Sequence, residues 1–435
     1  MGSLLARATL TMLAAAAGGP AAVRAAESGD RHHWQVELAT SYVATDSPLA
    51  SWPGGGLGKL RYAESDDDVN AVRLFAHYRG RITPTLWTTA VVDYVGDASA
   101  GLDVSEAFLD WRPIPKSPNQ QQLRVGMFYP PFSLENGESG WQSPFTYSYS
   151  AINTWIGEEI RPIGAEWSLR RRLGEPGSPH ELRAFAAGFF GNDPAGTLLF
   201  WRGWSLHDRQ TRLNDRLTIP PVPVFGAGGV QVGTRTQIIE PFEELDHEPG
   251  AYAGLEWRYG RRVLMQLAHY DNRADPNAFA DGEWGWDTSF THLGAQVSLP
   301  GEIGLVTQWM KGKTYWISGA RPDGTRWSMA RVVEDGFESK FVLLTRVLRN
   351  AHRLSLRYDD FVVVRAEPSP ALQSDSGHAW TLAYRYERSA RLSAGLEWLE
   401  ITSRRDLWPA FYSLPSQVTE RQLRLQVSLR QGARR

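Results

Sequence analysis

The chain has 435 residues, a formal net charge of −2 at pH 7, 42% hydrophobic residues and no cysteine. The near-neutral charge argues against a polyelectrolyte partner, so no nucleic acid is expected. The lack of cysteine excludes disulfides and thiolate metal sites, and it suits a chain that crosses an oxidising periplasm.

The first residues have the pattern of an export signal. Arg7 supplies a positive charge, and the apolar stretch 10–19 is too short to span a bilayer as a helix. Val23 and Ala25 have the small side chains that a signal peptidase site requires. We therefore predict a secretory signal peptide over residues 1–25, with a buried helix or a retained anchor as the alternative.

Residues 26–435 are dominated by two-residue periodicity, which is typical of β-strands. Val72, Leu74 and Tyr78 share one face of such a segment, and residues 254–271 form two alternating arms around a turn at Gly260. About sixteen segments of this kind occur. They are joined by connections that are alternately short and mostly longer.

Strand length separates a membrane barrel from a soluble β-fold, which is the alternative. Segments of about eleven residues, tilted by about 45°, cover about 25 Å, which is the height of the apolar band of an outer-membrane barrel. We therefore predict an all-β fold for residues 26–435: a transmembrane antiparallel β-barrel of about 16 strands, with long outer loops and short periplasmic turns, in the bacterial outer membrane.

A more specific pattern spans residues 123–167. A strand ends in Gly-x-Phe-x-x-Pro-Phe-x-Leu-Glu, and after a long loop a new strand opens near Arg-x-x-Gly; the residues are Gly126, Phe128, Pro131, Phe132, Leu134, Glu135, Arg161 and Gly164. This arrangement resembles the phosphate-selective porin family. The resemblance implies a sixteen-stranded, trimeric porin whose third outer loop, here about 130–160, folds inward and narrows the pore. Its candidate constriction residues are Pro131, Phe132, Glu135, Trp141 and Trp155.

The charges of this loop depart from the family pattern. Phosphate selectivity in the family rests on arginines and lysines at the constriction. Here the loop has no Lys or Arg before Arg161, and it carries four glutamates, Glu135, Glu138, Glu158 and Glu159. Phosphate specificity therefore does not follow from the resemblance.

Gly-x-Glu-Trp occurs at residues 164–167, 254–257 and 395–398, with a looser echo at 109–111. Period 2 places the aromatic residues on the lipid face, where such rings form girdles; the candidates are Trp111, Trp167, Trp257, Tyr259 and Trp398. The acids then face the lumen, and the candidate lumen carboxylates are Glu106, Asp110, Glu166, Glu256 and Glu397. We expect the three motif glutamates to pair with arginines such as Arg170, Arg258 and Arg385, although a solute-binding ring is an alternative.

The longest connection, about 192–249, contains the densest basic group of the chain. Either this segment enters the lumen and offers guanidinium groups to a passing anion, or it is a solvated outer loop balanced by Asp208 and Asp215. The pore and anion-contact candidates, here and on the strands, are Arg124, Arg202, Arg209, Arg212, Arg353, Arg357, Arg385 and Arg424.

Two acidic runs, 64–70 and 240–248, favour solvated loops over calcium or lipopolysaccharide sites. The sequence has no recognisable catalytic motif. We therefore predict a non-enzymatic porin: a homotrimer without cofactor or metal that gives passive diffusion to small polar or anionic solutes, with phosphate-type anions as one option. Outer-membrane lipid and lipopolysaccharide are its expected surroundings. The alternatives are a non-conducting structural or adhesive barrel and an outer-membrane hydrolase.

Overall fold

The computed structural model describes residues 31–432 except 64–68, 96–100, 116, 176, 221–237, 281, 321–325, 366–373 and 407. The predicted signal peptide lies outside the described residues. Within them, no helix is long and apolar enough to cross a membrane.

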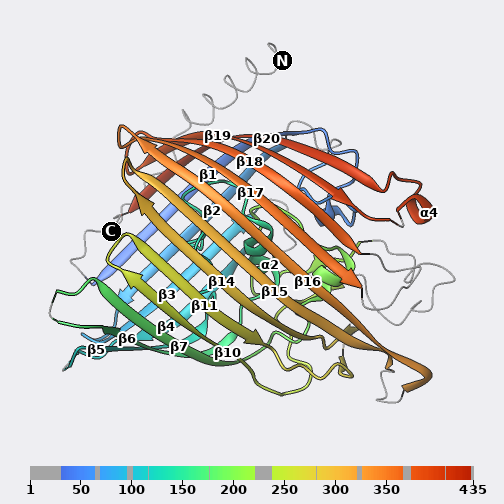
Figure 1. Ribbon diagram of the computed structural model, residues 1–435, viewed down its shortest axis with the longest axis horizontal. Coiled ribbons are helices and arrows are strands. Elements are labelled where there is room, and N and C mark those ends of the chain that lie inside the picture. The colour runs from blue at the N-terminus through green and yellow to red at the C-terminus, as the bar shows by residue number, and fades with distance from the viewer. Residues whose placement is uncertain are drawn as a thin grey trace, which may run out of the picture.

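Sixteen antiparallel strands form one closed barrel, in which each strand pairs with its neighbours along the chain and β1 pairs with β20 (Figure 1). The predicted barrel and its strand number are thereby confirmed. The wall strands are β1 His32–Thr45, β2 Val69–Arg81, β3 Leu86–Val95, β4 Leu102–Trp111, β5 Asn119–Met127, β6 Ile163–Arg172, β7 His180–Phe190, β10 Gly250–Tyr259, β11 Val263–Asp271, β14 Asp287–Leu299, β15 Ile303–Ala320, β16 Arg326–Leu348, β17 His352–Arg365, β18 Asp375–Glu387, β19 Leu392–Arg404 and β20 Gln417–Gly432.

Short elements occupy the loops. They are the helical turn η1 Trp52–Gly54, the helices α2 Ala151–Glu159, α3 Thr197–Trp201 and α4 Trp408–Tyr412, and two small sheets, β8 Leu217–Thr218 with β9 Ile238–Ile239 and β12 Phe279–Ala280 with β13 Glu283–Trp284.

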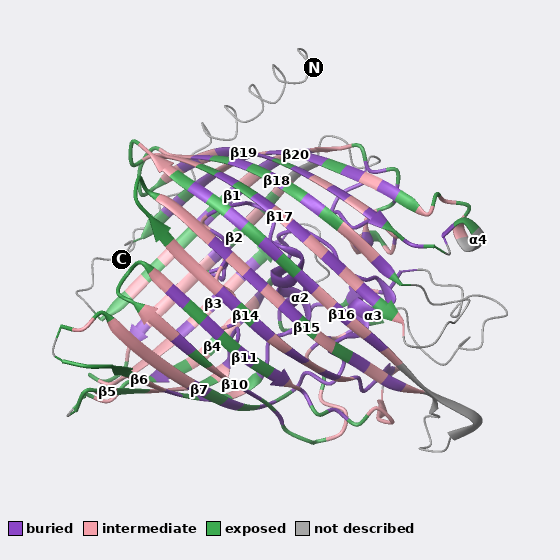
Figure 2. Cartoon of the chain, viewed as in Figure 1, coloured by how far each residue is buried: buried purple, intermediate pink, exposed green. Residues whose placement is uncertain are grey.

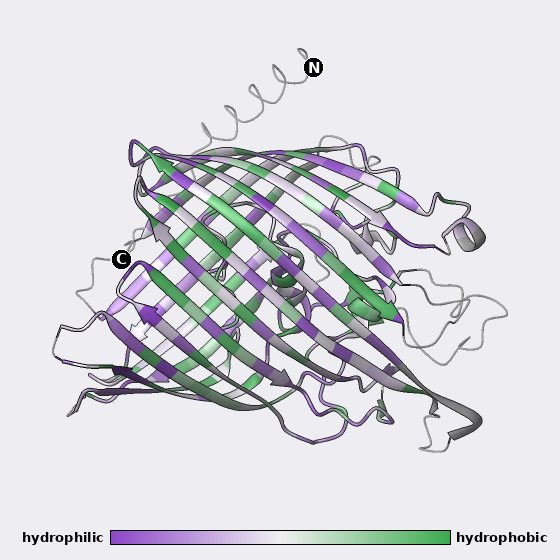
Figure 3. Cartoon of the chain, in the orientation of Figure 1, coloured by the Kyte–Doolittle hydropathy of each residue, from purple (hydrophilic) through white to green (hydrophobic). Residues whose placement is uncertain are grey.

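The two faces of the wall differ, as period 2 requires. Figures 2 and 3 show burial and hydropathy alternating along the strands. Outward side chains such as Leu255, Leu356 and Leu382 are large, apolar and exposed, whereas the neighbouring Glu256 and Arg357 are buried inside. An exposed apolar band around a closed barrel can be solvated only by lipid. The chain is therefore an outer-membrane β-barrel.

The connections alternate in length around the barrel. One end carries short turns, such as 260–262 between β10 and β11, and the other carries the long loops. In barrels of this type the short turns face the periplasm. Two long connections turn inward: loop L3, residues 128–162, which contains α2 (Figure 1), and the lumen segment, residues 191–219, which is almost wholly buried.

The assignment of the apolar face to lipid can be tested with a charged substitution. Leu356→Arg puts a cation on the outer face of β17, and we expect it to destabilise the folded barrel by about 2–4 kcal/mol if the residue lies near the membrane midplane. Urea-dependent refolding into lipid vesicles measures this. His77→Arg, on an inward-facing position of β2, is the matched control. Equal losses in the two variants would contradict the assignment of faces.

Candidate functional site

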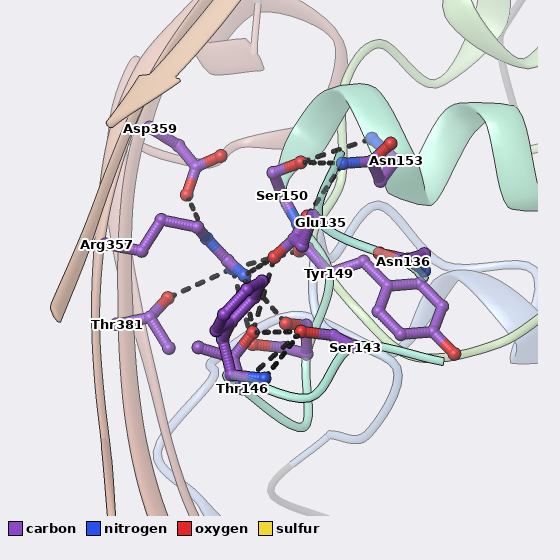
Figure 4. A network of polar contacts seen from close by, with 12 residues as sticks. Glu135, Asn136, Ser143, Thr146, Tyr149, Ser150, Asn153, Arg357, Asp359 and Thr381 are labelled. Carbon is purple, nitrogen blue, oxygen red and sulfur yellow. Dashed lines mark hydrogen bonds and ion pairs between the residues drawn. The ribbon is translucent and has the colours of Figure 1, made fainter. Parts of the chain in front are cut away.

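A buried ionic network fixes loop L3 to the wall (Figure 4). The Arg357 guanidinium, on β17, donates to Glu135 of loop L3 at 2.6 Å and to Asp359 of its own strand at 2.7 Å. It also donates to the carbonyl oxygens of Ser148 and Tyr149, at 2.7 and 3.0 Å. Arg357, Glu135 and Asp359 are fully buried, so the network braces the loop rather than contacting the solvent.

Other wall side chains bind the loop backbone. The Glu397 carboxylate accepts from the amides of Tyr147 and Ser148, at 2.5 and 2.9 Å. Arg385 donates to the carbonyl oxygen of Ser143 at 2.7 Å. The expected Glu397–Arg385 ion pair is not formed, because both side chains are used to position loop L3.

The predicted constriction residues lie in two environments. Phe132 and Trp155 are buried in an aromatic cluster against the β7–β17 wall; the Trp155 ring lies 5.4 Å from Phe290 and 5.2 Å from Phe337. Pro131 accepts from the Gln266 side chain at 2.6 Å. The Trp141 ring stacks on Tyr129 at 4.2 Å. These contacts fill one side of the lumen. The side chains that line the open space of the lumen therefore lie on its opposite side.

The lumen segment enters the barrel, which is one of the two alternatives raised by the sequence. Arg202 makes a bidentate pair with Glu158 of α2 at 2.7 and 2.6 Å, and both side chains are buried. Burial would raise the pKa of Glu158, but Arg202 and His207 outweigh it and hold that pKa at about 2. Burial lowers the pKa of His207. Arg202 is therefore the ionic partner of Glu158, and its charge is neutralised inside the protein.

Glu159 has a different environment. It accepts from the Leu198 amide at 3.0 Å and from the Trp155 indole at 2.5 Å. Burial raises its pKa to about 7, with no cation close enough to offset that effect fully. This carboxyl therefore ties α2 to the start of α3.

The other basic residues of the lumen segment are also engaged. Arg212 donates to Asp215 at 2.8 Å, and Arg209 lies 3.8 Å from the same carboxylate. Asp208 bridges Arg61 and Arg424 at 2.8 and 2.7 Å. Contact of Arg202, Arg209 or Arg212 with a passing anion stays a prediction, and their burial favours a bracing role.

The lumen carboxylates follow the register of the strands. Glu166 pairs with Arg124 at 2.9 Å and with Arg183 at 3.0 Å. The predicted pairing of Glu166 with Arg170 is therefore wrong. Arg170 instead lies 3.4 Å from Glu181. The remaining carboxylates are placed as follows: Glu256 pairs with Arg258 at 2.6 Å, as expected, Asp110 with Arg112 at 2.5 Å, and Glu106 lines the chamber described next.

Two polar chambers occupy the other side of the lumen, between loop L3 and the strands from β18 through β20 and β1 to β5. The upper chamber, toward the long loops, is lined by Glu37, Arg61, Tyr62, Arg73, Phe75, Tyr147, Tyr149, Asp208, Arg385 and Arg424, among others. The lower chamber, toward the short turns, is lined by His77, Arg79, Glu106, Phe108, Asp110, Arg112, Gln122, Arg124, Glu138 and Gly140, among others. Sequence reasoning did not single out Arg61, Phe75 or Arg79, although the period of β2 placed Phe75 and Arg79 on its inward face.

The girdle candidates lie on the outer face. Trp111, Trp167 and Trp398 have exposed rings, as does Tyr259. Trp257 is half-buried and stacks against His180 at 5.7 Å. Their contact with the lipid boundary stays a prediction.

The acidic runs have different outcomes. Residues 64–68 lie outside the described residues. In the second run, Glu244 and Asp246 approach Asp193, and these carboxylates accept from backbone amides, such as that of Leu245 to Asp193 at 2.5 Å. These carboxylates therefore stabilise the conformation of their loops by binding backbone amides.

No protein-family model matches the sequence, and no curated protein matches it. Similar solved structures each align with 92% of this chain. The outer membrane channel DcaP of Acinetobacter baumannii has a TM-score of 0.51 and 10% identity over 96% of its length. The outer membrane protein OmpT of Vibrio cholerae, in trimer form, has a TM-score of 0.50 and 8% identity over 99% of its length. OmpF of Salmonella typhi, in complex with daunomycin, has a TM-score of 0.50 and 8% identity over 97% of its length. At these identities the likeness establishes the fold, that of a sixteen-stranded porin-type barrel.

The anchoring of loop L3 can be tested at Arg357. Arg357→Ala leaves Glu135 and Asp359 buried without their cation, and we expect a loss of about 3–5 kcal/mol in unfolding free energy with faster proteolysis of loop L3. Arg216→Ala removes an exposed pair with Glu240 and should change stability by at most about 1 kcal/mol. A similar small loss in both variants would show that the network does not hold the loop.

Proposed function

We propose that this chain is an outer-membrane porin that gives passive diffusion to small polar solutes, with a preference for anions. The observation that carries the proposal is the placement of the loop L3 carboxylates. Glu135, Glu158 and Glu159 are fully buried and held by internal partners. Only Glu138 lines a chamber, with its side chain 38% exposed and 3.9 Å from Arg430.

The polar chambers have an excess of positive charge. Seven arginines and five carboxylates line the two chambers. On the loop L3 side, the upper chamber presents the neutral residues Gln142, Ser143, Thr146, Tyr147 and Tyr149. Rings of fixed charge select ions of opposite sign in a pore, so the lining supports a weak preference for anions. A particular solute such as phosphate is not part of the proposal.

Arg385 of this lining, together with the neighbouring Arg353, supplies an anion contact. Arg353 on β17 and Arg385 on β18 are direct cross-strand neighbours, and both point inward. Within the described residues, neither forms an ion pair, and the buried Nε of Arg385 has no hydrogen-bond acceptor. Like charges that lie directly opposite each other on a sheet destabilise it. An anion between or beside the two guanidinium groups would relieve this repulsion.

The surroundings and assembly belong to the same proposal. The apolar band contacts outer-membrane lipid, and the long-loop end contacts lipopolysaccharide. The trimer form of the similar Vibrio cholerae protein supports a homotrimer. We propose no enzymatic role.

A non-conducting barrel is the second candidate, because loop L3 and the lumen segment fill much of the interior with a continuous buried core. The two functions differ in one measurement. Current steps in a planar bilayer, from wild type or from a variant with a widened lumen, support the porin, and their absence from both supports a structural barrel.

Charge selection is tested by Arg385→Gln. Glutamine can still donate to Ser143 but removes the unpaired positive charge, so we expect the anion-to-cation permeability ratio to fall about twofold. Reversal potentials in a potassium chloride gradient measure the ratio. Arg216→Gln, at the exposed position, should leave it unchanged. Equal ratios in wild type and Arg385→Gln would refute the proposed anion preference.

A further inference from the structure

The two chambers follow one another along the inner face of β2. Along β2, which runs from the long-loop end to the short-turn end, Arg73 and Phe75 line the upper chamber, and His77 and Arg79 line the lower one. Gly140 of loop L3 lies opposite Phe75. A Cβ at Gly140 would lie 3.3 Å from the Phe75 ring, which is itself only 2% exposed.

Both sides of this contact are held in place. The backbone of Gly140 has a φ of 66°, which favours glycine. The Gln210 side chain donates to the carbonyl oxygens of Gly140 and Trp141, each at 3.0 Å. On the wall, Arg73 is paired with Asp93 at 3.1 Å, and its guanidinium lies 5.9 Å from the Phe75 ring.

Phe75 is unusual for its position. Many inward aromatic rings pack into the cluster around α2, and Phe108, the other phenylalanine that lines a chamber, packs against that cluster. Phe75 is not part of it. It lies instead among the charged residues of the polar chambers. A large apolar ring at this position excludes water and ions from the gap that it fills.

We propose that Phe75, closed against Gly140, is the gate of the channel. Its ring blocks the neck between the two chambers, and its displacement lets small solutes pass. The ring therefore sets the size limit and the conductance, whereas the surrounding arginines set the charge preference. This inference rests on the proposed porin function, and it locates the resistance of the pore at one side chain.

Removal of the ring is the first test. Phe75→Ala should raise the single-channel conductance in planar bilayers at least about twofold, because the narrowest point widens. Phe361→Ala is the matched control. Phe361 is also 2% exposed and inward-facing, but it belongs to the buried cluster, so its truncation should leave the conductance unchanged. Wild-type conductance in Phe75→Ala would overturn the proposal.

The lack of cysteine allows a second test that does not depend on a change in pore size. Phe75→Cys and Phe361→Cys each introduce the only thiol of the chain. A negatively charged methanethiosulfonate should reduce the current through Phe75→Cys when added from either side of the bilayer and leave Phe361→Cys unaffected. Unchanged current through a conducting Phe75→Cys channel, with its thiol still free, would overturn the proposal.

The outcomes separate this inference from the porin function. If wild type conducts and Phe75→Ala conducts equally, only the gate is refuted. If wild type is silent and Phe75→Ala conducts, the gate is supported, and wild type is a closed channel. If both are silent in folded form, the porin function and the gate fail together.

Discussion

The structure depends on one constraint: a backbone that crosses hydrocarbon has no water with which to hydrogen-bond. Each strand must therefore pair on both edges, and the sheet must close. Here closure is made by β1 and β20, which pair from Gln35–Gly432 to Thr45–Gln422. Once the sheet is closed, the two-residue period divides every strand between lipid and lumen. The outer face must then be apolar, and the inner face is free to carry charge.

That freedom creates a second problem, because a lumen of sixteen strands is wide and its charges need partners. The protein fills one side with aromatic rings and the buried helix α2. It then anchors the filling with ion pairs that have no exposure, such as Arg357–Glu135 and Arg202–Glu158. Pairs of this kind are costly to desolvate and costly to break. Their role is therefore to position loop L3 and the lumen segment rather than to add net stability. The polar chambers remain on the opposite side of the lumen.

The sequence was sufficient for the wall but not for its interior. Periodicity and loop lengths predicted the strand number, and the inward loop followed from a resemblance around Pro131. Ion partners could not be predicted in the same way. Glu166 is close to Arg170 in sequence, but strand register places it beside Arg124 and Arg183. Asp208 meets Arg61 and Arg424 only because distant segments enter the same lumen. The sequence does mark Phe75, which is an aromatic residue on the charged inner face of β2.

The recurrent Gly-x-Glu-Trp illustrates how local pattern and tertiary packing combine. Period 2 explains the outward Trp and the inward Glu, but it gives no reason for the glycine, which normally weakens a strand. The structure supplies the reason. A Cβ at Gly254 would lie 2.3 Å from the Phe185 ring. One at Gly164 would lie 2.3 Å from the carbonyl oxygen of Gly188 and 2.7 Å from the Cβ of Phe189, and one at Gly395 would lie 2.3 Å from the carbonyl oxygen of Tyr384 and 2.4 Å from the Tyr147 hydroxyl. Each glycine leaves space for an aromatic residue that lies close to the strand, and at Gly164 and Gly395 also for the backbone of the neighbouring strand. In two copies that side chain comes from the wall. In the third it comes from loop L3, next to the amides that Glu397 binds, so the same motif that builds the wall also seats the inward loop.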